Sequence, residues 1–357
     1  MGDAYFDTFM GHGPKQIAHW EHWSCPDAET YLSGIDYYDH PRLCRQRLRE
    51  LYPQLNLWIP EKDDPIPRPE LAKDKSRGRW GDAYREIWQQ DVASSRFKTY
   101  EERMAFSPLA QGDFTGWNIV EDGDYSSEEI IYQRYRRNYP AEWGDKAPEG
   151  SGTSVSFYNT TFQWPMLVFG YQNFLEMSLD PDFERIMDEF AEINRRVFRA
   201  FARLPVNFVV CHDDIVLTNG PCCSPSWMHK FVFPRYEEYW SMLKAAGKEV
   251  LFMVDGCMDA FVDDVMACGA RGIITEPYTD FKAIARKYKD CFIAGEGDNR
   301  ILMHNNPDEI KAMVRSMAET GRMSAGYMMC IGNHIPFNVP PPAIKLYLDY
   351  SAEVAQR

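Results

Sequence analysis

Apolar and polar positions follow a regular pattern from about residue 153 onward, where short apolar runs alternate with longer segments of helical spacing. Within 181–204, apolar side chains recur every three or four positions, as on one face of an amphipathic helix. Repeated strand-helix units of this length predict parallel strands covered by helices. The predicted strands are 155–158, 206–211, 249–254, 272–275, 291–295 and 325–331, and the predicted helices are 165–175, 181–204, 225–246, 258–268, 279–288, 307–319 and 341–354.

The amino-terminal part of the chain is less regular. A doubly wound sheet would also fit the later pattern, but no GxGxxG motif follows a predicted strand. We therefore predict an α/β fold of the (β/α)₈ TIM-barrel class, with residues 1–357 as one domain and 1–110 as an extension packed on it. In the early part we expect a helix at 27–52, a proline-rich loop at 53–69, strand-like pieces at 79–81 and 115–120, and a surface excursion at 121–152.

Chemically active side chains follow five of the predicted strands. The run Cys211 to Asp214 comes directly after an apolar strand, and a helix with a serine N-cap and a proline at its first position follows at Ser224. In a barrel, the carboxyl ends of the strands carry the chemistry. The other four ends are Asp255-Gly256-Cys257, Glu276-Pro277, Glu296-Gly297-Asp298 and Cys330 to His334.

Each of these strand ends also has a purely structural explanation. Asp255 and Asp298 could cap the following helix or turn, and Cys330 could be a small core residue. Glu276 is harder to explain in this way, because glutamate is a poor cap and the strand before it is apolar. Five strand ends that each carry a carboxylate, a histidine or a cysteine together favour a functional site, since titratable groups with perturbed pKa values gather at such sites.

Charge and cysteine content narrow the class of protein. The 357 residues carry a net charge of −14, which argues against nucleic acid or an anionic membrane as partner. The nine cysteines are an odd number without any CxxC, as is usual in a reducing cytosol. No apolar run approaches the roughly 20 residues needed to cross a bilayer. We therefore expect a cytoplasmic protein.

Several runs resemble the uroporphyrinogen decarboxylase superfamily, which includes cobamide-dependent methyltransferases such as the aryl-ether O-demethylases. The upstream run HWEHWSCPDAETYLSGIDYYDHPRLCRQRLRELYP is similar to members on the methyltransferase side. The resemblance covers most of residues 17–350 and implies a TIM barrel with its active site at the carboxyl-terminal mouth. The other runs are HDDIVLTNGPCCSP with the following Phe233-Pro234, VDGCMDAFVDDVMACGARGIITEP, GEGDNRIL and GNHIPFNVPPPAI.

The sequence departs from two patterns of that superfamily. It lacks the arginine-rich RxxGR-like element with which the decarboxylase holds porphyrin carboxylates. The HxC zinc ligands of thiol methyltransferases fall on Met253 and Asp255, and the third ligand falls on or beside Asn333. Met and Asn are poor zinc ligands, so we expect no bound metal, with Asp255, Cys330 and His334 as weak candidates. No DxHxxG cobalamin motif is present, so a corrinoid would arrive on a partner protein.

The resemblance and these departures together imply a corrinoid-protein-dependent methyltransferase that demethylates a small methoxylated, aromatic compound. A departing oxygen must be protonated, and a neutral acid at the strand ends would supply the proton. We expect a corrinoid protein and a small methylated substrate as partners and keep a homodimer as an option. The candidate catalytic residues are His212, Asp213, Asp255, Glu276 and His334, with Asp213 or Asp214 orienting a histidine; the candidate substrate-binding residues are Tyr158, Trp164, Asn219, Cys257, Tyr278, Glu296 and Asn333.

Three alternatives stay open. Methyl transfer from a methylated corrinoid protein to an acceptor would need zinc and a site that activates a thiolate. A decarboxylase of an acidic substrate would need no partner protein. A non-catalytic binding protein would leave the titratable side chains at the five strand ends without a role.

Overall fold

The structure, a computed structural model, describes residues 4–23, 25–68, 96–117 and 119–356. Its contacts divide the chain into two compact units, each of which is described by itself. Unit 1 comprises Met1–Gly78, Asp255–Asp259 and Ile273–Arg357, and unit 2 comprises Arg79–Val254 and Ala260–Gly272. The prediction of one domain with an extension over 1–110 stays a prediction.

Unit 2 is built on three parallel strands in the order β3-β4-β7. The central strand β4 is buried along its whole length, which agrees with its apolar sequence FVVC before His212. Val209 of β4 lies opposite Val155 of β3 and Val250 of β7. The strands are β3 (Ser154–Phe157), β4 (Phe208–His212) and β7 (Glu249–Met253), with a separate hairpin of β5 (Val216–Leu217) and β6 (Gly220–Pro221).

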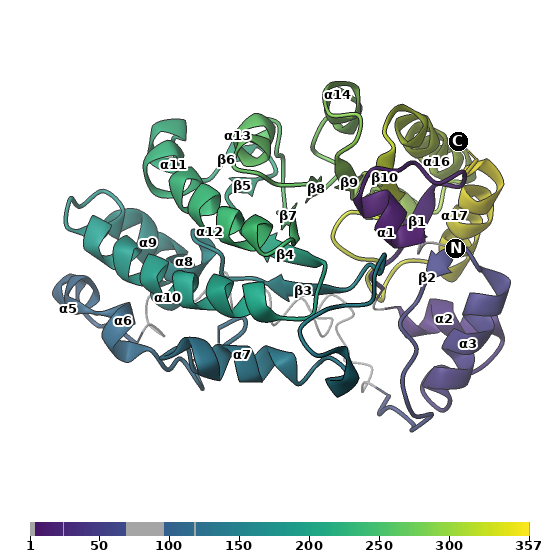
Figure 1. The fold of residues 1–357 in the computed structure, drawn as a ribbon. Coiled ribbons are helices and arrows are strands. Elements are labelled where there is room, and N and C mark those ends of the chain that lie inside the picture. Colours follow the sequence, from purple (N-terminus) through teal and green to yellow (C-terminus); the bar gives the residue numbers. More distant parts are fainter. Residues whose placement is uncertain (1–3, 24, 69–95, 118, 357) are drawn as a thin grey trace. The chain divides into compact units, whose positions relative to one another are not determined.

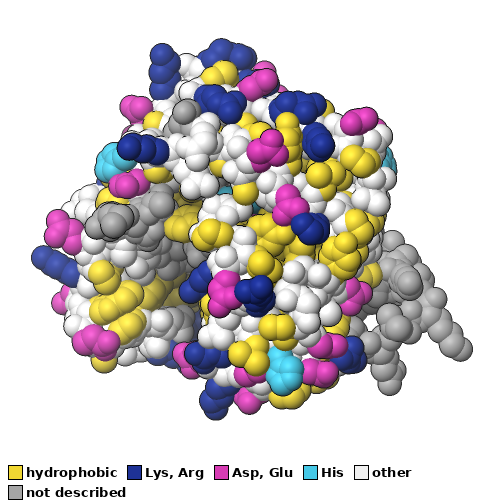
Figure 2. Space-filling model, turned by 90° about the vertical axis from the view of Figure 1, so that its right-hand side faces the viewer, with side chains coloured by type: hydrophobic (Ala, Val, Ile, Leu, Met, Phe, Trp, Pro, Cys, Tyr) yellow, Lys and Arg dark blue, Asp and Glu magenta, His cyan; other side chains and the backbone are white. Residues whose placement is uncertain are grey.

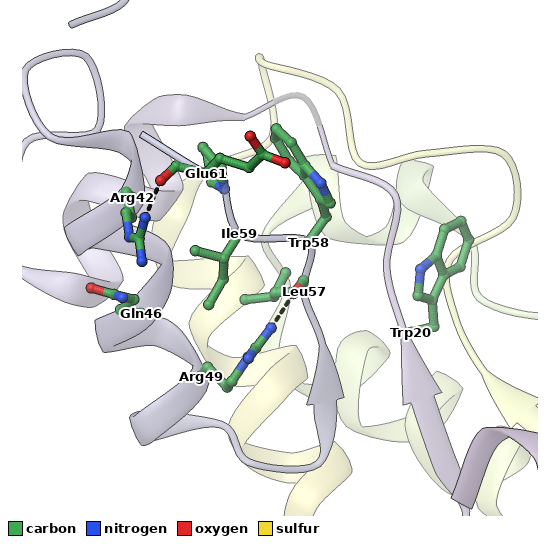
Figure 3. Close-up of a pocket in the computed structure, with 9 residues that line it drawn as sticks. Trp20, Arg42, Gln46, Arg49, Leu57, Trp58, Ile59 and Glu61 are labelled. Carbon is green, nitrogen blue, oxygen red and sulfur yellow. Dashed lines mark hydrogen bonds between the residues drawn. The ribbon is translucent and has the colours of Figure 1, made fainter. Parts of the chain in front are cut away.

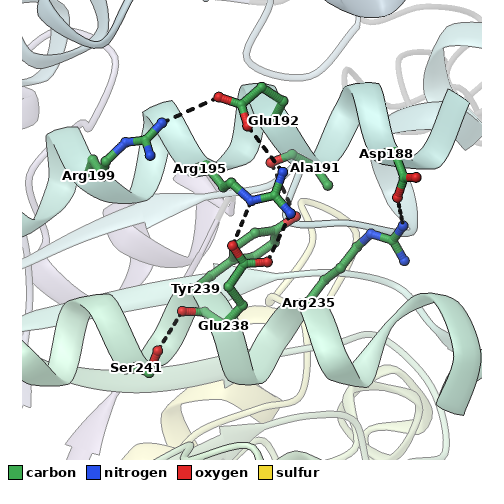
Figure 4. Close-up of polar contacts among 9 residues, drawn as sticks. All are labelled: Asp188, Ala191, Glu192, Arg195, Arg199, Arg235, Glu238, Tyr239 and Ser241. Carbon is green, nitrogen blue, oxygen red and sulfur yellow. Dashed lines mark hydrogen bonds and ion pairs between the residues drawn. The ribbon is translucent and has the colours of Figure 1, made fainter. Parts of the chain in front are cut away.

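Two long helices of unit 2, α10 (Phe183–Arg203) and α12 (Phe233–Ala245), run along these strands (Figure 1). The buried face of α10 carries apolar residues at helical spacing, among them Phe190 and Val197. Toward α12, Arg195 binds Glu238 on that helix, as Figure 4 shows. Such half-exposed ion pairs stabilise by less than about 1 kcal/mol each, so apolar burial holds the two helices together.

The remaining helices of unit 2 lie before, between and after its strands. Asn194 of α10 is buried and donates from its side-chain amide to the backbone oxygen of Thr160, just after β3. Ser224 caps α11 by accepting from the Trp227 N–H, as its position before Pro225 predicts. The helices are α5 (Tyr100–Ala105), α6 (Pro108–Gln111), α7 (Glu128–Arg136), α8 (Gln163–Phe169), α9 (Tyr171–Met177), α11 (Pro225–Phe231) and α13 (Val262–Ala267), with a short 3₁₀ turn η2 (Ala141–Trp143).

Unit 1 contains the other parallel strands, in the order β2-β1-β10-β9-β8. Neighbouring backbones approach closely where β9 ends at Gly295, because a Cβ there would lie 1.7 Å from the Thr275 carbonyl oxygen. Gly295 also has φ +108°, which disfavours a side chain. The strands are β1 (Ala18–Trp20), β2 (Leu55–Asn56), β8 (Gly272–Ile274, with Gly272 assigned to unit 2), β9 (Phe292–Ala294) and β10 (Gly326–Met329).

The helices of unit 1 alternate with its strands along most of the chain. Helix α16 packs against α17 and, through Met317 and Val314, into the core. Helix α3 begins at Pro41, and its backbone N–H groups at Arg42 and Leu43 donate to the Asp63 carboxylate. The helices are α1 (Ala4–Phe9), α2 (Pro26–Ser33), α3 (Pro41–Leu51), α14 (Phe281–Lys287), α15 (Asn299–His304), α16 (Pro307–Met323) and α17 (Pro341–Val354).

The parallel strands, most of them followed by helices, fit the α/β TIM-barrel class, so the predicted fold class is confirmed. The predicted single helix 27–52 is wrong, because Gly34 ends α2 in the left-handed conformation. Gly170 likewise divides the predicted helix 165–175. The predicted piece 115–120 forms no strand in its described part, and 79–81 lies outside the described residues. Within the described chain, every helix is too short or too polar to cross a bilayer.

Candidate functional site

Unit 2 places a hydrogen-bonded histidine at the carboxyl end of β4. His212 is buried, and its Nε2 lies 2.9 Å from Oδ1 of Asp214. The other oxygen of Asp214 accepts from Gln163 Nε2 at 3.1 Å, so the carboxylate is held from two sides. The ring of Tyr158, which follows β3, lies 4.5 Å from the imidazole ring between centroids. The His212 cluster is Tyr158, Gln163, His212, Asp213 and Asp214.

This arrangement assigns one proton. An ionised carboxylate only accepts hydrogen bonds, so Nε2 of His212 carries the hydrogen that points to Asp214. His212 is therefore a buried histidine that is oriented by a carboxylate.

Asp213, the neighbour of His212, has a different environment. Its fully buried carboxylate accepts from the backbone N–H groups of Phe162 and Gln163, at 2.8 and 2.6 Å, and from the Tyr236 hydroxyl at 2.6 Å. Burial raises the pKa of Asp213 to about 7, and these hydrogen bonds partly offset that rise. Asp213 thus fixes the start of α8, while Asp214 orients His212.

A second carboxyl group of unit 2, Glu121, was not predicted as a site residue. Burial raises the pKa of Glu121 to about 7, and hydrogen bonds from the Tyr158 N–H and the Tyr135 hydroxyl partly offset this rise. Its backbone has φ +55°, which is uncommon for a residue other than glycine. Asn159 fixes the neighbouring backbone by donating to the Val120 oxygen at 2.7 Å. The polar stretch around Glu121 gave no signal of burial in the sequence.

Unit 1 places another histidine after β10, with a different partner. Nδ1 of His334 lies 2.7 Å from the Asn333 side-chain oxygen, and the Asn333 amide nitrogen donates to Asp255 Oδ2 at 3.1 Å. The ring of His22, which follows β1, lies 5.9 Å from the ring of His334 between centroids. The His334 cluster is His22, Asp255, Asn333 and His334.

His334 is a neutral imidazole at neutral pH. Burial, helped by the nearby His22, lowers the pKa of His334 to about 4. The amide oxygen of Asn333 accepts a hydrogen bond without supplying a full negative charge, so it does not compensate the burial. Nδ1 therefore carries the proton and donates it to Asn333. Asn333 itself has φ +63°, a conformation that asparagine tolerates better than most residues.

A buried acid lies after β1 and supports the same region of unit 1. Glu21 accepts from His19 Nε2 at 2.8 Å and from the Tyr347 hydroxyl on one oxygen. Its other oxygen accepts from the Ile331 N–H at 3.1 Å. Glu21 thus anchors the segment that leads to Asn333. The run HWEHW contributed only to the family resemblance, so the sequence did not identify Glu21 or His22 as site residues.

The other predicted residues of unit 1 have mixed surroundings. The Glu296 carboxylate accepts from Tyr327, Thr320 and Ser316, and burial raises its pKa, so its described contacts are structural. Tyr278 lies under the Arg300 guanidinium, 4.7 Å from its ring centroid. Glu276, Cys257 and Tyr278 are half-buried.

Two predicted substrate-binding residues of unit 2 have other surroundings. Trp164 is fully buried and packs against Tyr125 at a ring-centroid distance of 4.9 Å. Asn219 is exposed in the turn between β5 and β6. Both positions are explained by core packing and by turn geometry.

The weak metal candidates of unit 1 do not form a ligand set. Among the described residues, the ligand atoms of Asp255, Cys330 and His334 do not all lie within 4.8 Å of one another. Burial raises the pKa of the Cys330 thiol well above its usual value, which disfavours the thiolate that zinc binds. This donor set therefore fits zinc poorly, and the expectation of no bound metal stays a prediction.

The predicted catalytic residues are divided between the two units. His212 and Asp213 belong to unit 2, whereas Asp255, Glu276 and His334 belong to unit 1. Within the units, the structure joins His212 to Asp214 and Asp255 to His334 through Asn333. That all of them line one pocket stays a prediction.

Comparison with known proteins places this fold in a family. The model of the uroporphyrinogen decarboxylase (URO-D) family matches residues 161–354, more than half of the chain, and the chain belongs to this family. The fold is also similar to that of a methyltransferase from Methanosarcina mazei, with a TM-score of 0.55 and 13% sequence identity over 98% of this chain and 97% of that chain. No curated protein matches the chain.

Proposed function

We propose that this protein is a methyltransferase that takes a methyl group from a small methoxylated aromatic compound and passes it to Co(I) of a partner corrinoid protein. The observation that carries this proposal is the buried His212–Asp214 pair at the carboxyl end of β4, where barrel enzymes hold their chemistry. The similarity in fold to a methyltransferase supports it.

In this methyl transfer the protein has to supply a proton, because Co(I) of the carrier is the nucleophile. Co(I) supplies the electron pair that forms the new bond to the methyl carbon. The C–O bond breaks, its electron pair stays on oxygen, and one proton converts the departing phenoxide into a phenol. His212, protonated and oriented by Asp214, is the group that delivers this proton, as general acids do in other enzymes.

The remaining residues of the His212 cluster prepare this acid. Asp213 fixes the backbone at Phe162 and Gln163, and the Gln163 side chain in turn holds Asp214. The ring of Tyr158 lies against the imidazole, 4.5 Å away between centroids. In this arrangement, Asp213 is a positioning residue and His212 is the catalytic acid.

The corrinoid is a substrate on its carrier protein in this proposal. The carrier must leave to deliver its methyl group, so its interface with this chain should be small and weak. The sequence has no cobalamin motif of the DxHxxG type, which agrees with a separate carrier.

The test is an assay of methyl transfer with the full chain. A Co(I) corrinoid carrier is mixed with a panel of methoxyarenes, aliphatic methyl ethers and methylamines, and methyl-Co(III) absorbance is followed. We expect absorbance to rise with at least one methoxyarene and only when carrier, substrate and this chain are all present. Absence of methyl-Co(III) with the whole panel would contradict the proposal.

A decarboxylase is the second candidate, because the matching family model is that of uroporphyrinogen decarboxylase. It would release carbon dioxide from an acidic substrate without a carrier protein. Carbon dioxide release from aromatic or porphyrin carboxylates in the absence of any corrinoid would favour this candidate. The opposite direction of methyl transfer, from a methylated carrier to an acceptor, is tested by adding methyl-Co(III) carrier and following its loss.

A further inference from the structure

Unit 1 contains a groove of about 790 Å³ beside β1 and β2 (Figure 3). Trp20, the last residue of β1, lines it, as does the segment 57–61 that follows β2. The groove therefore lies at the carboxyl ends of two parallel strands, where α/β proteins bind ligands. Its volume is in the usual range for small-molecule sites, roughly 300–1,000 Å³.

One wall of the groove is a basic face of α3. Arg42, Gln46 and Arg49 are four and three positions apart, so their side chains share this face, as Figure 3 shows. Arg42 donates to the Glu61 backbone oxygen, and Arg49 Nη2 donates to the Leu57 backbone oxygen at 2.9 Å. These bonds fix both guanidinium groups at the groove.

The two guanidinium groups keep donors for a ligand. Each has five N–H groups, and among the described residues each of these two uses one on a backbone oxygen. In the described part of the chain, neither Arg42 nor Arg49 forms an ion pair, whereas Arg45 and Arg47 of the same helix pair with Glu29 and Glu50. The groove arginines are thus the members of this helix whose charge is not neutralised by a carboxylate.

Flat apolar surfaces complete the groove. Trp58 is 70% exposed, although tryptophan is costly to leave in water. The guanidinium of Arg45 lies 5.7 Å from its ring centroid. Trp20 supplies a second indole. Indole rings stack favourably with other aromatic rings, so they suit a planar ligand.

The charge of the surroundings favours a small anion. Glu61 is the one carboxylate among the lining residues, against two arginines. On the face drawn in Figure 2, Lys and Arg side chains are interspersed with Asp and Glu, and the chain as a whole carries −14. A local cationic wall in an acidic protein attracts a compact anion and disfavours a long polyanion.

We propose that this groove binds a small aromatic carboxylate. The carboxylate accepts hydrogen bonds from the guanidinium group of Arg49, which is bound beside Trp58 at the Leu57 oxygen, and Arg42 adds positive charge to the same wall. The aromatic ring lies against the indole of Trp58. The site shares no residue with the His212 cluster, and the inference does not depend on methyl transfer to a corrinoid.

Isothermal titration calorimetry of the full chain tests this site. The probes are benzoate, 4-methoxybenzoate, methoxybenzene, acetate and a short acidic peptide. We expect both aromatic carboxylates to bind and R42Q/R49Q to weaken them at least about tenfold, because charge-assisted hydrogen bonds are lost. W58A should weaken them about fivefold through lost stacking. R47Q, which removes a paired arginine from the same helix, should bind as the parent does.

Several outcomes would overturn the inference. They are no binding of benzoate by the parent at its highest soluble concentration, equal binding of methoxybenzene or of acetate, and binding of the acidic peptide alone. Unchanged affinity in R42Q/R49Q would do the same. If R42Q/R49Q fails to unfold cooperatively on heating, the binding of benzoate by R42K/R49K and by W58A tests the site instead. Lysine keeps the positive charge of arginine but lacks its planar fork of donors. R42K/R49K should then retain part of the affinity, and parental affinity in W58A would count against the site.

Discussion

The His212 cluster of unit 2 and the His334 cluster of unit 1 both place a histidine just beyond or at a strand end, but the partners differ. His212 is buried against the carboxylate of Asp214, whereas His334 is half-buried against the amide oxygen of Asn333. Burial lowers the pKa of His334 to about 4, and its amide acceptor supplies no full negative charge to oppose that effect.

The partner of each histidine therefore decides what it can do. In the proposed reaction, His212 gives a proton to the departing oxygen. His334, whose pKa is lowered to about 4, stays neutral and acts as a hydrogen-bonding group. Two histidines that look equivalent in the sequence thus have different chemistry, and four experiments test or refine this contrast.

The largest effect is expected on removal of the proposed acid. H212N should lower methyl transfer from a methoxyarene by about 10²–10⁴-fold, the usual contribution of a general acid. The rate of methyl-Co(III) formation measures this effect. H229N is the matched control, because His229 is exposed and pairs with Asp264 on the surface of the same unit. A parent-like rate in H212N would remove His212 from the chemistry.

The next largest effect is expected on the free energy of unfolding when the buried carboxylate of Asp213, beside His212, is removed. D213A leaves three buried donors without their acceptor, and each costs about 1–3 kcal/mol, so the unfolding free energy should fall by at least ~3 kcal/mol. Denaturant unfolding measures the loss. N333G, at an exposed position of the other cluster where φ is +63°, adds no backbone strain and should cost less than about 1 kcal/mol. Equal losses in the two variants would contradict the contrast in burial.

A smaller effect is expected in the pH dependence of stability. The pKa of Glu121 is raised to about 7, above the ordinary value near 4.3, so the folded chain holds a proton that the unfolded chain releases. The resulting stability is present below about pH 4 and is lost as pH rises through about 7. E121Q should therefore lose less stability than the parent between pH 5 and 8.

Unfolding free energies at several pH values measure this difference, which is at most about 1.4 kcal/mol per pH unit for one group. Asp213, whose pKa is also raised to about 7, should keep part of the dependence in E121Q. E142Q serves as the control, since Glu142 is exposed. If E121Q and E142Q follow the same pH curve, Glu121 does not hold a proton in the folded chain.

The smallest effect is on the other histidine. N333D/D255N places a carboxylate where the amide oxygen now accepts from His334 Nδ1 and keeps a donor where Asp255 now lies, so it should raise the pKa of His334 above about 4. NMR titration of the imidazole measures the change. Methyl transfer should change only a few-fold, because His334 is not the proposed acid. An unchanged pKa would show that burial alone governs this histidine.

Hydrophobic spacing was enough to predict most of the fold. The apolar run before His212 and the helical spacing of 181–204 each correspond to an observed element, β4 and α10. The interruptions were not predicted, because Gly34 and Gly170 end helices through local backbone conformation rather than through a change of apolar pattern. Element boundaries depend on such single residues.

The candidate site was only partly accessible to sequence reasoning. His212 could be found because it follows an apolar strand. The different roles of Asp213 and Asp214 could not, because adjacent residues at a strand end point in opposite directions and contact different neighbours. Glu121 and Glu21 were missed because their burial is produced by tertiary packing that leaves no local pattern in the chain.

The most direct measurement of the central claim is the dependence of the methyl-transfer rate on the leaving phenol. A series of ring-substituted methoxyarenes, whose phenols span a range of acidity, is assayed with the parent and with H212N. If His212 protonates the departing oxygen, the parent should show a shallow dependence on phenol acidity. H212N should show a steep one, with its largest loss for the least acidic phenols. Parallel dependences, with the same loss for every phenol, would contradict proton donation by His212.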